Sequence, residues 1–424
     1  MIFQEKKHKR DTGLLRSSLK ISTVEGSWWG IMHGTVESYF SAFYEYLRYS
    51  SYEISILATF PVFFGSVIQK LSKKAFSLIQ SRRLLIVILK WIQTVTIPII
   101  FYIGFISGHY VLMLLFVCLF YTCSLSIAAP FMSWMGYLVP GKIRGKYFGL
   151  RTQYIKLFML ISSLIAGSIL HSFTASPLIG FGIIFFLGMT ANVLSTLMIS
   201  KKYEPPYNVI DEDSQKVDIR KSNFSNLKNY IRYDCLSELS FSISAPLIMV
   251  YWLRNLNFNY IELAILINVG HLFSLVSLKY FGQKIDVLGT YFAIKWTSIL
   301  VSLLPVLWIL VFYMPNHLKL IVSMVIFSIG SILFNTRVLA MDNKLFEHMD
   351  GKNMINITSK RVFYRGIFIF IGGIIGGSLT KLDSQNYFIS LSCLDTPIHL
   401  VFIVSTLFRL IVWRIYLYGK LDSI

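Results

Sequence analysis

Charged residues are scarce in this chain, and their scarcity excludes an ordinary water-soluble domain. They make up 14% of the 424 residues, while 55% are hydrophobic; a typical soluble domain has roughly 25% charged residues. The apolar residues also occur in long runs, such as 84–89 and 97–106. Runs of about 20 apolar residues indicate membrane spans, because that length crosses the hydrocarbon of a bilayer. The composition therefore predicts an integral membrane protein.

The sequence also lacks the marks of secretion, metal binding and nucleotide chemistry. Residues 1–20 are basic and contain no apolar core, which argues against a signal peptide. The four cysteines show no metal-ligand or redox spacing, so we expect reduced thiols among apolar residues. Gly136 to Lys142 resembles a phosphate loop, but Ile143 stands where that loop needs Ser or Thr. No nucleophile–base arrangement is present, so we expect no enzyme, no cofactor and no metal.

Twelve apolar segments are long enough to cross a membrane. Unbroken apolar runs favour helices, since the strands of a membrane barrel alternate apolar and polar residues. The predicted fold class is therefore all-α with twelve transmembrane helices. The predicted spans are 27–48, 52–70, 84–106, 109–135, 148–172, 177–199, 231–253, 260–280, 290–313, 317–341, 361–381 and 398–417.

The net charge of +19 would suit a nucleic-acid partner, but its distribution indicates membrane insertion instead. With the N-terminus inside, the inner segments hold 30 of the 40 Lys and Arg residues and the outer loops hold four. Basic residues accumulate in the cytoplasmic loops of membrane proteins. We therefore expect a monomeric, multi-pass protein of the inner (cytoplasmic) membrane, surrounded by the lipid bilayer, with both termini cytoplasmic and no nucleic-acid partner.

A long polar segment divides the predicted spans into two sets of six. The expected domains are an N-terminal cytoplasmic segment (1–26), two six-helix bundles (27–199 and 231–418), a cytoplasmic linker (200–230) and a tail (419–424). Two similar halves predict internal repeats. The matching pairs are 140–142 with 350–352, Arg151 with Arg361, Tyr154 with Tyr364, 64–72 with 281–289 and, more weakly, Glu37 with Glu238.

Twelve spans in two sets, a long central linker and basic loops after spans two and eight resemble the Major Facilitator Superfamily. That family often carries a G-x-x-x-D-x-x-G loop after its second span and a weaker copy after its eighth. Here the second copy is the better one, with Gly282, Asp286 and Gly289. The first copy keeps Gly65 but has Gln69 in place of Asp.

The resemblance implies two helical bundles with related folds. Together they would move a small solute by alternating access, coupled to the movement of protons. The stretch 129–151 also resembles a loop of many bacterial superfamily members. We expect the loops at 64–83, 136–151, 281–289 and 342–361 to form a cytoplasmic gate whose basic residues make exposed ion pairs. The gate candidates are Gly65, Gln69, Arg83, Lys142, Arg144, Arg151, Gly282, Asp286, Gly289 and Arg361.

Ionisable residues inside spans are costly, so each is a candidate for function. Helical spacing groups His33, Glu37, Ser41 and Tyr44 on span one, and Asp234, Glu238 and Ser242 on span seven. The resemblance implies that spans one, four, seven and ten line a central cavity. A carboxylate held there can carry a proton, so Glu37, Glu238 and Asp234 are the coupling candidates, with Glu37 first. The alternative is a structural carboxylate paired with Lys or Arg.

The basic residues inside spans fall into two groups. Lys90 and Lys295 lie near cytoplasmic ends, where their long side chains are expected to snorkel to the headgroups. Lys156, Arg337 and Arg365 either face the cavity, which would then suit an organic anion, or pair with acids of neighbouring helices. The cavity candidates are His33, Ser41, Tyr44, Tyr121, Tyr154, Lys156, Ser242, Asn268, His271, Arg337 and Arg365.

Two other functions stay open on the sequence alone. One is a transporter-like sensor without turnover, and the other is a flippase for lipids or lipid-linked precursors. Small residues four apart in GGIIGG (372–377) indicate close helix packing rather than a ligand site.

Overall fold

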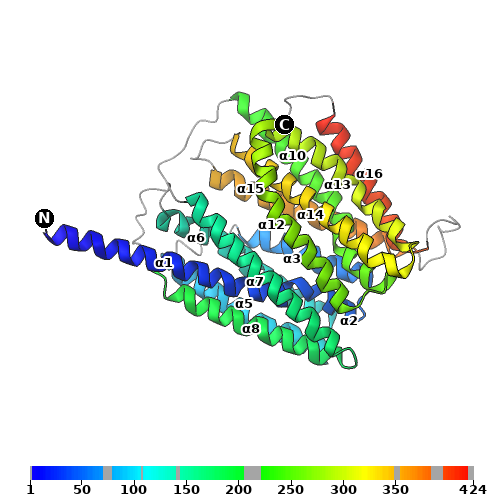
Figure 1. The fold of residues 1–424 in the computed structure, drawn as a ribbon, viewed down its shortest axis with the longest axis horizontal. Coiled ribbons are helices and arrows are strands. Elements are labelled where there is room, and N and C mark those ends of the chain that lie inside the picture. Colours follow the sequence, from blue (N-terminus) through cyan, green and yellow to red (C-terminus); the bar gives the residue numbers. More distant parts are fainter. Residues whose placement is uncertain are drawn as a thin grey trace. The chain divides into compact units, whose positions relative to one another are not determined.

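The structure is a computed structural model that describes residues 2–69, 79–106, 108–139, 144–204, 221–347, 354–382 and 395–418. All regular secondary structure in these ranges is helical (Figure 1). Within them, ten helices are long and apolar enough to cross a membrane, and each corresponds to one of the twelve predicted spans. The other two predicted spans are also helical, over Tyr260–Leu288 and over Ile2–Tyr46 with a short break.

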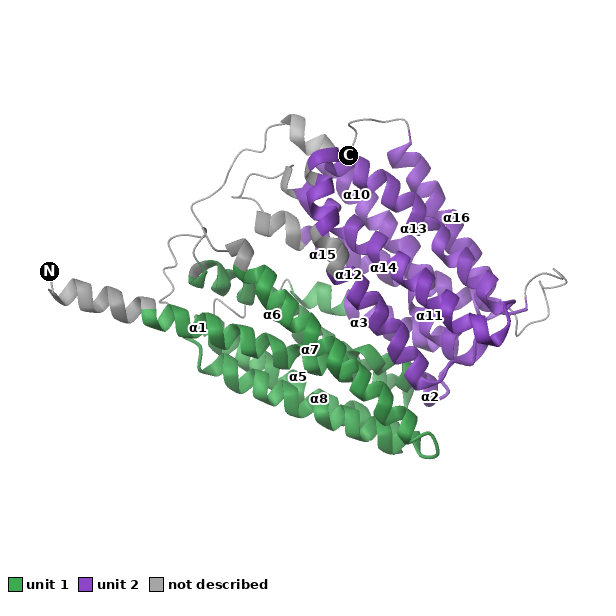
Figure 2. Cartoon of the chain, viewed as in Figure 1, with its two compact units in different colours: residues 1–43, 64–211 green, residues 44–63, 212–424 purple. Residues whose placement is uncertain are grey.

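The chain forms two compact units (Figure 2). Unit 1 comprises Met1–Phe43 and Phe64–Asp211, and unit 2 comprises Tyr44–Phe63 and Glu212–Ile424. The first half of the chain contains α1 (Ile2–Thr35), η1 (Glu37–Tyr39), α2 (Phe40–Tyr46), α3 (Ser51–Ile68), α5 (Arg82–Ile106), α6 (Tyr110–Leu138), α7 (Arg144–Ser172) and α8 (Pro177–Ser200). The second half contains α10 (Lys221–Ser244), η4 (Ala245–Leu247), α11 (Ile248–Val250), η5 (Tyr251–Asn255), α12 (Tyr260–Leu288), α13 (Thr290–Phe312), α14 (Asn316–Glu347), α15 (Met354–Leu379) and α16 (Pro397–Leu417).

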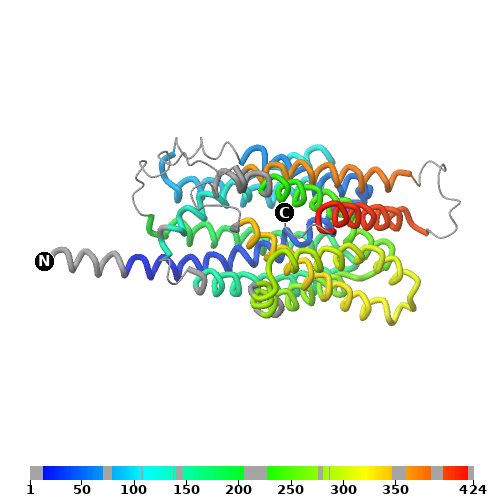
Figure 3. Tube along the Cα trace, turned by 90° about the horizontal axis from the view of Figure 1, so that it is seen from above, coloured from blue at the N-terminus to red at the C-terminus, as the bar shows by residue number. Residues whose placement is uncertain are grey.

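The helices pair in the same way in both units, as expected for two halves of one repeat. In unit 1, α1 packs against α7 and α8, and α5 packs against α6 and α8. In unit 2, α10 packs against α15 and α16, and α13 packs against α14 and α16. Figure 3 follows these helices along the Cα trace from a second direction. The internal similarity of the sequence thus corresponds to a repeated helix arrangement.

Local sequence signals explain where several helices begin and end. Asn259 accepts backbone hydrogen bonds at the start of α12, while Glu262 bonds back to the Asn259 N–H, which completes a capping box. Gly289 ends the same helix with φ of 87°, a backbone conformation that favours glycine. Pro177 and Pro397 stand at the first turns of α8 and α16, where a missing N–H costs nothing.

The first helix of each half changes to a 3₁₀ turn part-way along its span. In the first half α1 ends at Thr35 and the turn begins at Glu37; in the second half α10 ends at Ser244 and the turn begins at Ala245. This alignment places Glu37 opposite Ala245, so the weak sequence pairing of Glu37 with Glu238 is wrong. A match of six residues is short enough to arise by chance. The helix α1 also begins at Ile2, so most of segment 1–26 is continuous with span one.

Glycines let the first and fifth helices of each half approach closely. A Cβ at Gly30 would lie 2.5 Å from the carbonyl oxygen of Ile155 on α7, and Gly34 is as crowded against Met159. On α15, Gly372 and Gly376 meet the backbone of α10 in the same way. The packing role predicted for GGIIGG is therefore confirmed.

Large apolar side chains are exposed on the outer faces of the helices. Val111 is 72% exposed and Ile321 is 58% exposed, and Phe105 and Phe186 are exposed to a similar degree. Water would make this surface an aggregation liability, whereas lipid tails solvate it. The exposed faces therefore fit a membrane environment.

Candidate functional site

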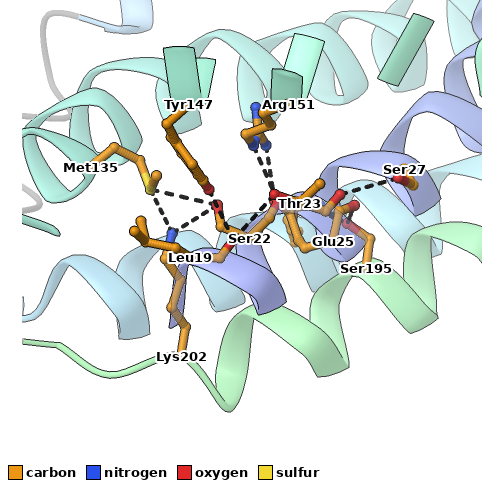
Figure 4. Close-up of polar contacts among 11 residues, drawn as sticks. Leu19, Ser22, Thr23, Glu25, Ser27, Met135, Tyr147, Arg151, Ser195 and Lys202 are labelled. Carbon is orange, nitrogen blue, oxygen red and sulfur yellow. Dashed lines mark hydrogen bonds and ion pairs between the residues drawn. The ribbon is translucent and has the colours of Figure 1, made fainter. Parts of the chain in front are cut away.

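A buried carboxylate, Glu25 on α1, is the centre of a charged cluster in unit 1 (Figure 4). Its Oε1 lies 3.1 Å from Lys90 Nζ on α5, and its Oε2 lies 3.1 Å from Arg151 Nη2 on α7. Ser195 on α8 donates to Oε1 over 3.1 Å, and Lys90 in turn donates to the Ser195 hydroxyl. Four helices of the unit thus converge on one carboxylate. We name Glu25, Lys90, Arg151 and Ser195 the Glu25 cluster.

Arg151 and Lys202 tie this cluster to the end of α8. Arg151 Nε donates to the Ser22 carbonyl oxygen over 3.1 Å, and its guanidinium lies 4.8 Å from the centre of the Phe131 ring. Lys202, fully buried, donates to Ser22 Oγ over 3.3 Å and lies over the ring of Trp134. Burial lowers the pKa of Lys202 to about 7, with Glu25 opposing the shift and Arg151 adding to it.

A cavity of about 190 Å³ lies beside the Glu25 cluster within unit 1. Its polar lining comprises Glu25, Lys90, Arg151, Gln93 and Ser124. Its apolar lining comprises Trp29, Ile127, Ala128, Phe131 and Ile199. Lys90 lies eight residues beyond the start of α5, which is about 12 Å along the helix axis. Lys90 therefore lies inside its span, whereas Ile199 is one residue from the end of α8, so the cavity extends toward that helix end.

Unit 2 carries a matching charged cluster between α10 and α15. Arg361 Nε lies 2.7 Å from Asp234 Oδ2, and Arg361 Nη1 lies 3.1 Å from Asp342 Oδ1. One turn further along both helices, Arg365 Nη2 donates to Glu238 Oε1 over 2.6 Å. The first and fifth helices of this half are thus joined by two consecutive carboxylate–arginine pairs.

The clusters of the two units are equivalent by position. Arg151 and Arg361 are 210 residues apart, and their partners Glu25 and Asp234 are 209 apart. Each pair joins the first helix of its half to the fifth. Charged groups in a span must be desolvated, which costs free energy. The presence of such a pair in both halves therefore indicates that it has a role.

Two further arginines of unit 2 are buried around a small polar cavity of about 10 Å³. Arg337 Nε donates to Ser298 Oγ over 3.2 Å, and Arg409 Nη2 donates to Ser244 Oγ over 2.8 Å. Both guanidinium groups lie over the Phe241 ring. Space for about one water molecule is left between them and the neighbouring serines.

Residues 30–379 match the sequence model of the family described as the Major Facilitator Superfamily. The chain belongs to the Major Facilitator Superfamily. It is therefore a multi-pass membrane transporter rather than an enzyme, and its twelve helices form the two pseudo-symmetric bundles of that fold.

Solved structures of several transporters share this fold over nearly the whole chain. A D-xylose-proton symporter superposes with a TM-score of 0.74 at 13% identity, covering 96% of this chain and 99% of its own. The nucleoside transporter NupG gives 0.66 at 12% identity, covering 96% and 99%. A bacterial homologue of the iron transporter ferroportin, in an inward-facing state, gives 0.66 at 13%, covering 96% and 97%. No curated protein sequence matches this chain.

Of the coupling candidates, Glu238 and Asp234 are less exposed to solvent than Glu37. Glu238 and Asp234 are buried and paired with arginines, which is the structural alternative that the sequence left open. Glu37 lies in the 3₁₀ turn η1, 19% exposed, with its Oε2 3.5 Å from His33 Nε2. The three carboxylates are therefore not equivalent.

The remaining cavity candidates are scattered through the superfamily fold. Arg337 and Arg365 belong to the unit 2 clusters, and Lys156 is partly buried. Tyr154 is exposed, Tyr44 and Ser242 are buried, and Asn268 donates to the Ala264 carbonyl oxygen over 2.7 Å. Ser41, Tyr121 and His271 are partly buried. Of the basic candidates, Arg337 and Arg365 thus belong to unit 2 and Lys156 to unit 1, and within neither unit do the described aromatic candidates share one site.

The gate candidates divide between helix ends and buried pairs. Arg151 and Arg361 were expected in exposed pairs, but both are engaged in buried ones, because their helices extend past the loop and carry them inward. Arg83 is exposed, and its N–H donates to Glu204 over 3.2 Å. Gly65 packs against Leu125 and Thr122, while Gln69 is partly buried.

The five other gate candidates lie on α12, at the start of α7 or outside the described residues. Gly282 is partly buried and Gly289 caps α12. Lys142 lies outside the described residues, as do the side chains of Arg144 and Asp286. Their roles stay predictions.

Sequence reasoning missed Glu25 and misplaced Lys90. Glu25 was assigned to a polar N-terminal segment, although it follows the last Lys of that segment by five residues and adjoins the first apolar run. Lys90 was expected to snorkel, but it is buried and paired with Glu25. Its partners lie on α1 and α8, so no local signal could have found them. In the described part of the chain, no group of three His, Cys, Asp or Glu side chains could hold a metal.

Proposed function

We propose that this chain is a secondary active transporter that moves a small solute across the inner membrane by alternating access, coupled to protons. The observation that carries the proposal is the repeated buried carboxylate–arginine pair, Glu25–Arg151 in unit 1 and Asp234–Arg361 in unit 2. Buried charges in spans mark ion and substrate pathways. Two similar halves with equivalent clusters suit a rocking motion about a central site.

Glu238 is the best candidate for the coupling carboxylate. Its partner Arg365 is 31% exposed, so water and protons can reach the pair. Asp234, in contrast, is held by Arg361 and lies 3.6 Å from the Arg365 Nε as well. A carboxylate with one partner gains a proton at the cost of one ion pair, whereas Asp234 would lose two. Glu37 is the second candidate because it is more exposed and has His33 as its partner.

Protonation of Glu238 removes the charge that holds Arg365 Nη2. Arg365 then keeps only its longer contact with Asp234 and is free to turn toward an incoming anion or toward Asp234. Loss of the proton restores the original pair. The protonation state of one carboxylate thereby selects between two arrangements of α10 and α15, which is the kind of bistable element that alternating access uses.

A flux experiment with purified protein in liposomes tests this proposal. A thermal-shift screen first identifies a solute that stabilises the protein, and uptake of that solute is then measured with and without an imposed pH gradient. Glu238→Gln should lose gradient-driven accumulation and keep solute exchange at zero gradient, because only the proton-carrying group is removed. Glu262→Gln is the matched control, since glutamine preserves the capping box of α12.

Two outcomes contradict the proposal. Full gradient-driven accumulation by Glu238→Gln excludes that residue as the proton carrier, and Glu37→Gln is then the variant to compare. If the wild-type protein moves no solute that it binds, turnover itself is excluded, and a transporter-like sensor becomes the better description. Lipid movement without solute flux would instead favour a flippase.

A further inference from the structure

We propose that the cavity of unit 1 binds a small organic anion, namely a carboxylate attached to a compact apolar body. The proposal rests on the transport function above, because it names the class of solute carried. It uses residues different from Lys156, Arg337 and Arg365, which suggested an anion on the sequence alone. Four properties of the cavity support it: charge, an unused donor, wall chemistry and size.

The charged lining of the cavity is unbalanced. It contains one acid, Glu25, and two bases, Lys90 and Arg151. Both bases already contact the same carboxylate, each over 3.1 Å. One positive charge is therefore left without a counter-ion inside a span, where an unbalanced charge is expensive. A ligand that brings one negative charge would make the site neutral.

An unused hydrogen-bond donor borders the same space. The Gln93 side chain is 1% exposed and lines the cavity, yet its Nε2 has no hydrogen-bond partner among the described residues. Arg151 donates from Nε to the Ser22 carbonyl oxygen and from Nη2 to Glu25, and its guanidinium also lines the cavity. A buried donor without a partner costs about 1–3 kcal/mol. An amide donor that lacks an acceptor, beside a guanidinium, fits a planar carboxylate.

The rest of the cavity lining is mostly apolar. Trp29 on α1 and the α6 residues Ile127, Ala128 and Phe131 face this space. Apolar walls offer no hydrogen-bond partners to the several hydroxyls of a sugar, but they favour the burial of an aromatic or branched aliphatic group. An organic cation is also disfavoured, because it would add a second unbalanced positive charge beside Lys90 and Arg151.

The volume limits the size of the ligand. A cavity of about 190 Å³ has room for several water molecules and therefore for a compact ligand. A benzoate-sized molecule suits this space. The solute class is therefore a small monocarboxylate with one apolar group.

Ligand binding by purified protein in detergent tests the inference without any need for flux. Benzoate should raise the melting temperature in a saturable manner, while benzamide, its neutral counterpart, and benzylamine, a cation, should not. Calorimetry then gives the dissociation constant of benzoate. Equal stabilisation by benzoate and benzamide would overturn the proposal, because charge would not contribute to recognition.

Two variants locate the binding site. Gln93→Leu removes the unused donor at similar volume and should weaken benzoate binding about 10- to 100-fold, the value of one hydrogen bond to a charged group. Ala128→Trp fills the cavity from α6 without replacing any residue of the Glu25 cluster and should abolish binding. Gln153→Leu, on the exposed face of α7, is the matched control and should bind as wild type. Melting temperatures without ligand show whether each variant is folded.

The outcomes separate this inference from the proposed function. Benzoate binding unchanged in both Gln93→Leu and Ala128→Trp places the ligand elsewhere and overturns the inference. Proton-coupled flux of a neutral solute, with no benzoate binding, overturns the inference and leaves the proposed function standing. Cavity-dependent benzoate binding without any flux supports the anion site and contradicts the proposed function.

Discussion

Lys202 shows how a single residue links this fold to pH. Its ammonium is fully buried two residues beyond α8, and burial lowers its pKa from 10.5 to about 7. The unfolded chain keeps an ordinary lysine, so between about pH 7 and 10.5 it binds more protons at this position than the folded chain. Stability at this site therefore rises with pH across that window. Below about pH 7 both states are protonated and the penalty of burying the charge is complete.

We predict that Lys202→Met stabilises the protein most at low pH. Methionine keeps the long apolar stem over Trp134 and Phe131 but carries no charge to desolvate. The gain in melting temperature over wild type should be largest at pH 6 and should shrink steadily as the pH rises from 7 to 10. Thermal unfolding of both proteins in detergent at several pH values measures this. Lys201→Met, at an exposed neighbouring site, is the control and should show no such trend.

Residue types inside spans could be predicted from the sequence, but their partners could not. Glu238 and Arg365 were both recognised as costly charges, and the structure pairs them although they are 127 residues apart. Glu25 was overlooked because it stands at the boundary between a polar and an apolar segment. Burial at such a boundary depends on which helices surround it, and here α5, α7 and α8 all do.

At the scale of helices, glycines decide how closely the first and fifth helices of each half approach. On α1, Gly26, Gly30 and Gly34 are spaced four apart and all face α7. This close approach is what allows Arg151 to reach Glu25 from the neighbouring helix. The sequence showed the small residues on α15, the fifth helix of the second half, but not those on α1, whose apolar run begins only after Glu25.

We predict that Gly34→Ala destabilises the protein by roughly 1–3 kcal/mol, the usual cost of overpacking. The added Cβ would lie within 3.0 Å of both the Met159 carbonyl oxygen and the Ser162 hydroxyl, and the backbone atom cannot move aside cheaply. Gly136→Ala on α6 meets nothing within 4 Å and should be neutral or slightly stabilising. Chemical or thermal unfolding of the two variants measures the difference. Equal stability of both would show that α1 and α7 can separate without cost.

At the scale of the whole molecule, the repeated helix pairing indicates a transporter built from two similar halves. The distribution of Lys and Arg among the loops gives its orientation, and we propose on this basis that both termini are cytoplasmic. The helix α8 then crosses from an outer loop that contains Ala175 to an inner segment that contains Lys201. Its 24 residues extend about 36 Å, enough to cross the hydrocarbon.

Cysteine labelling tests this topology. In a variant without native cysteines, Ala175→Cys should react with a membrane-impermeant maleimide on intact cells from which any outer membrane has been removed. Lys201→Cys should react only after the membrane is permeabilised. Both positions are exposed in the structure, so access to the reagent is limited only by the membrane. The reverse pattern would place the termini outside and contradict the proposed orientation.

The sequence by itself determined the twelve spans, the two halves and the membrane environment, because all three depend on composition and on patterns that are local along the chain. It also identified Arg151 and Arg361 as equivalent residues. Only the tertiary structure decided what those arginines do. In the structure, Arg151 is paired with the buried Glu25 and Arg361 is buried against Asp234. Lys90, expected at the membrane surface, belongs to the Glu25 cluster, and a cavity with an unbalanced charge lies beside that cluster. These features depend on which helix faces meet, and that choice is made by packing across more than a hundred residues rather than by any local pattern.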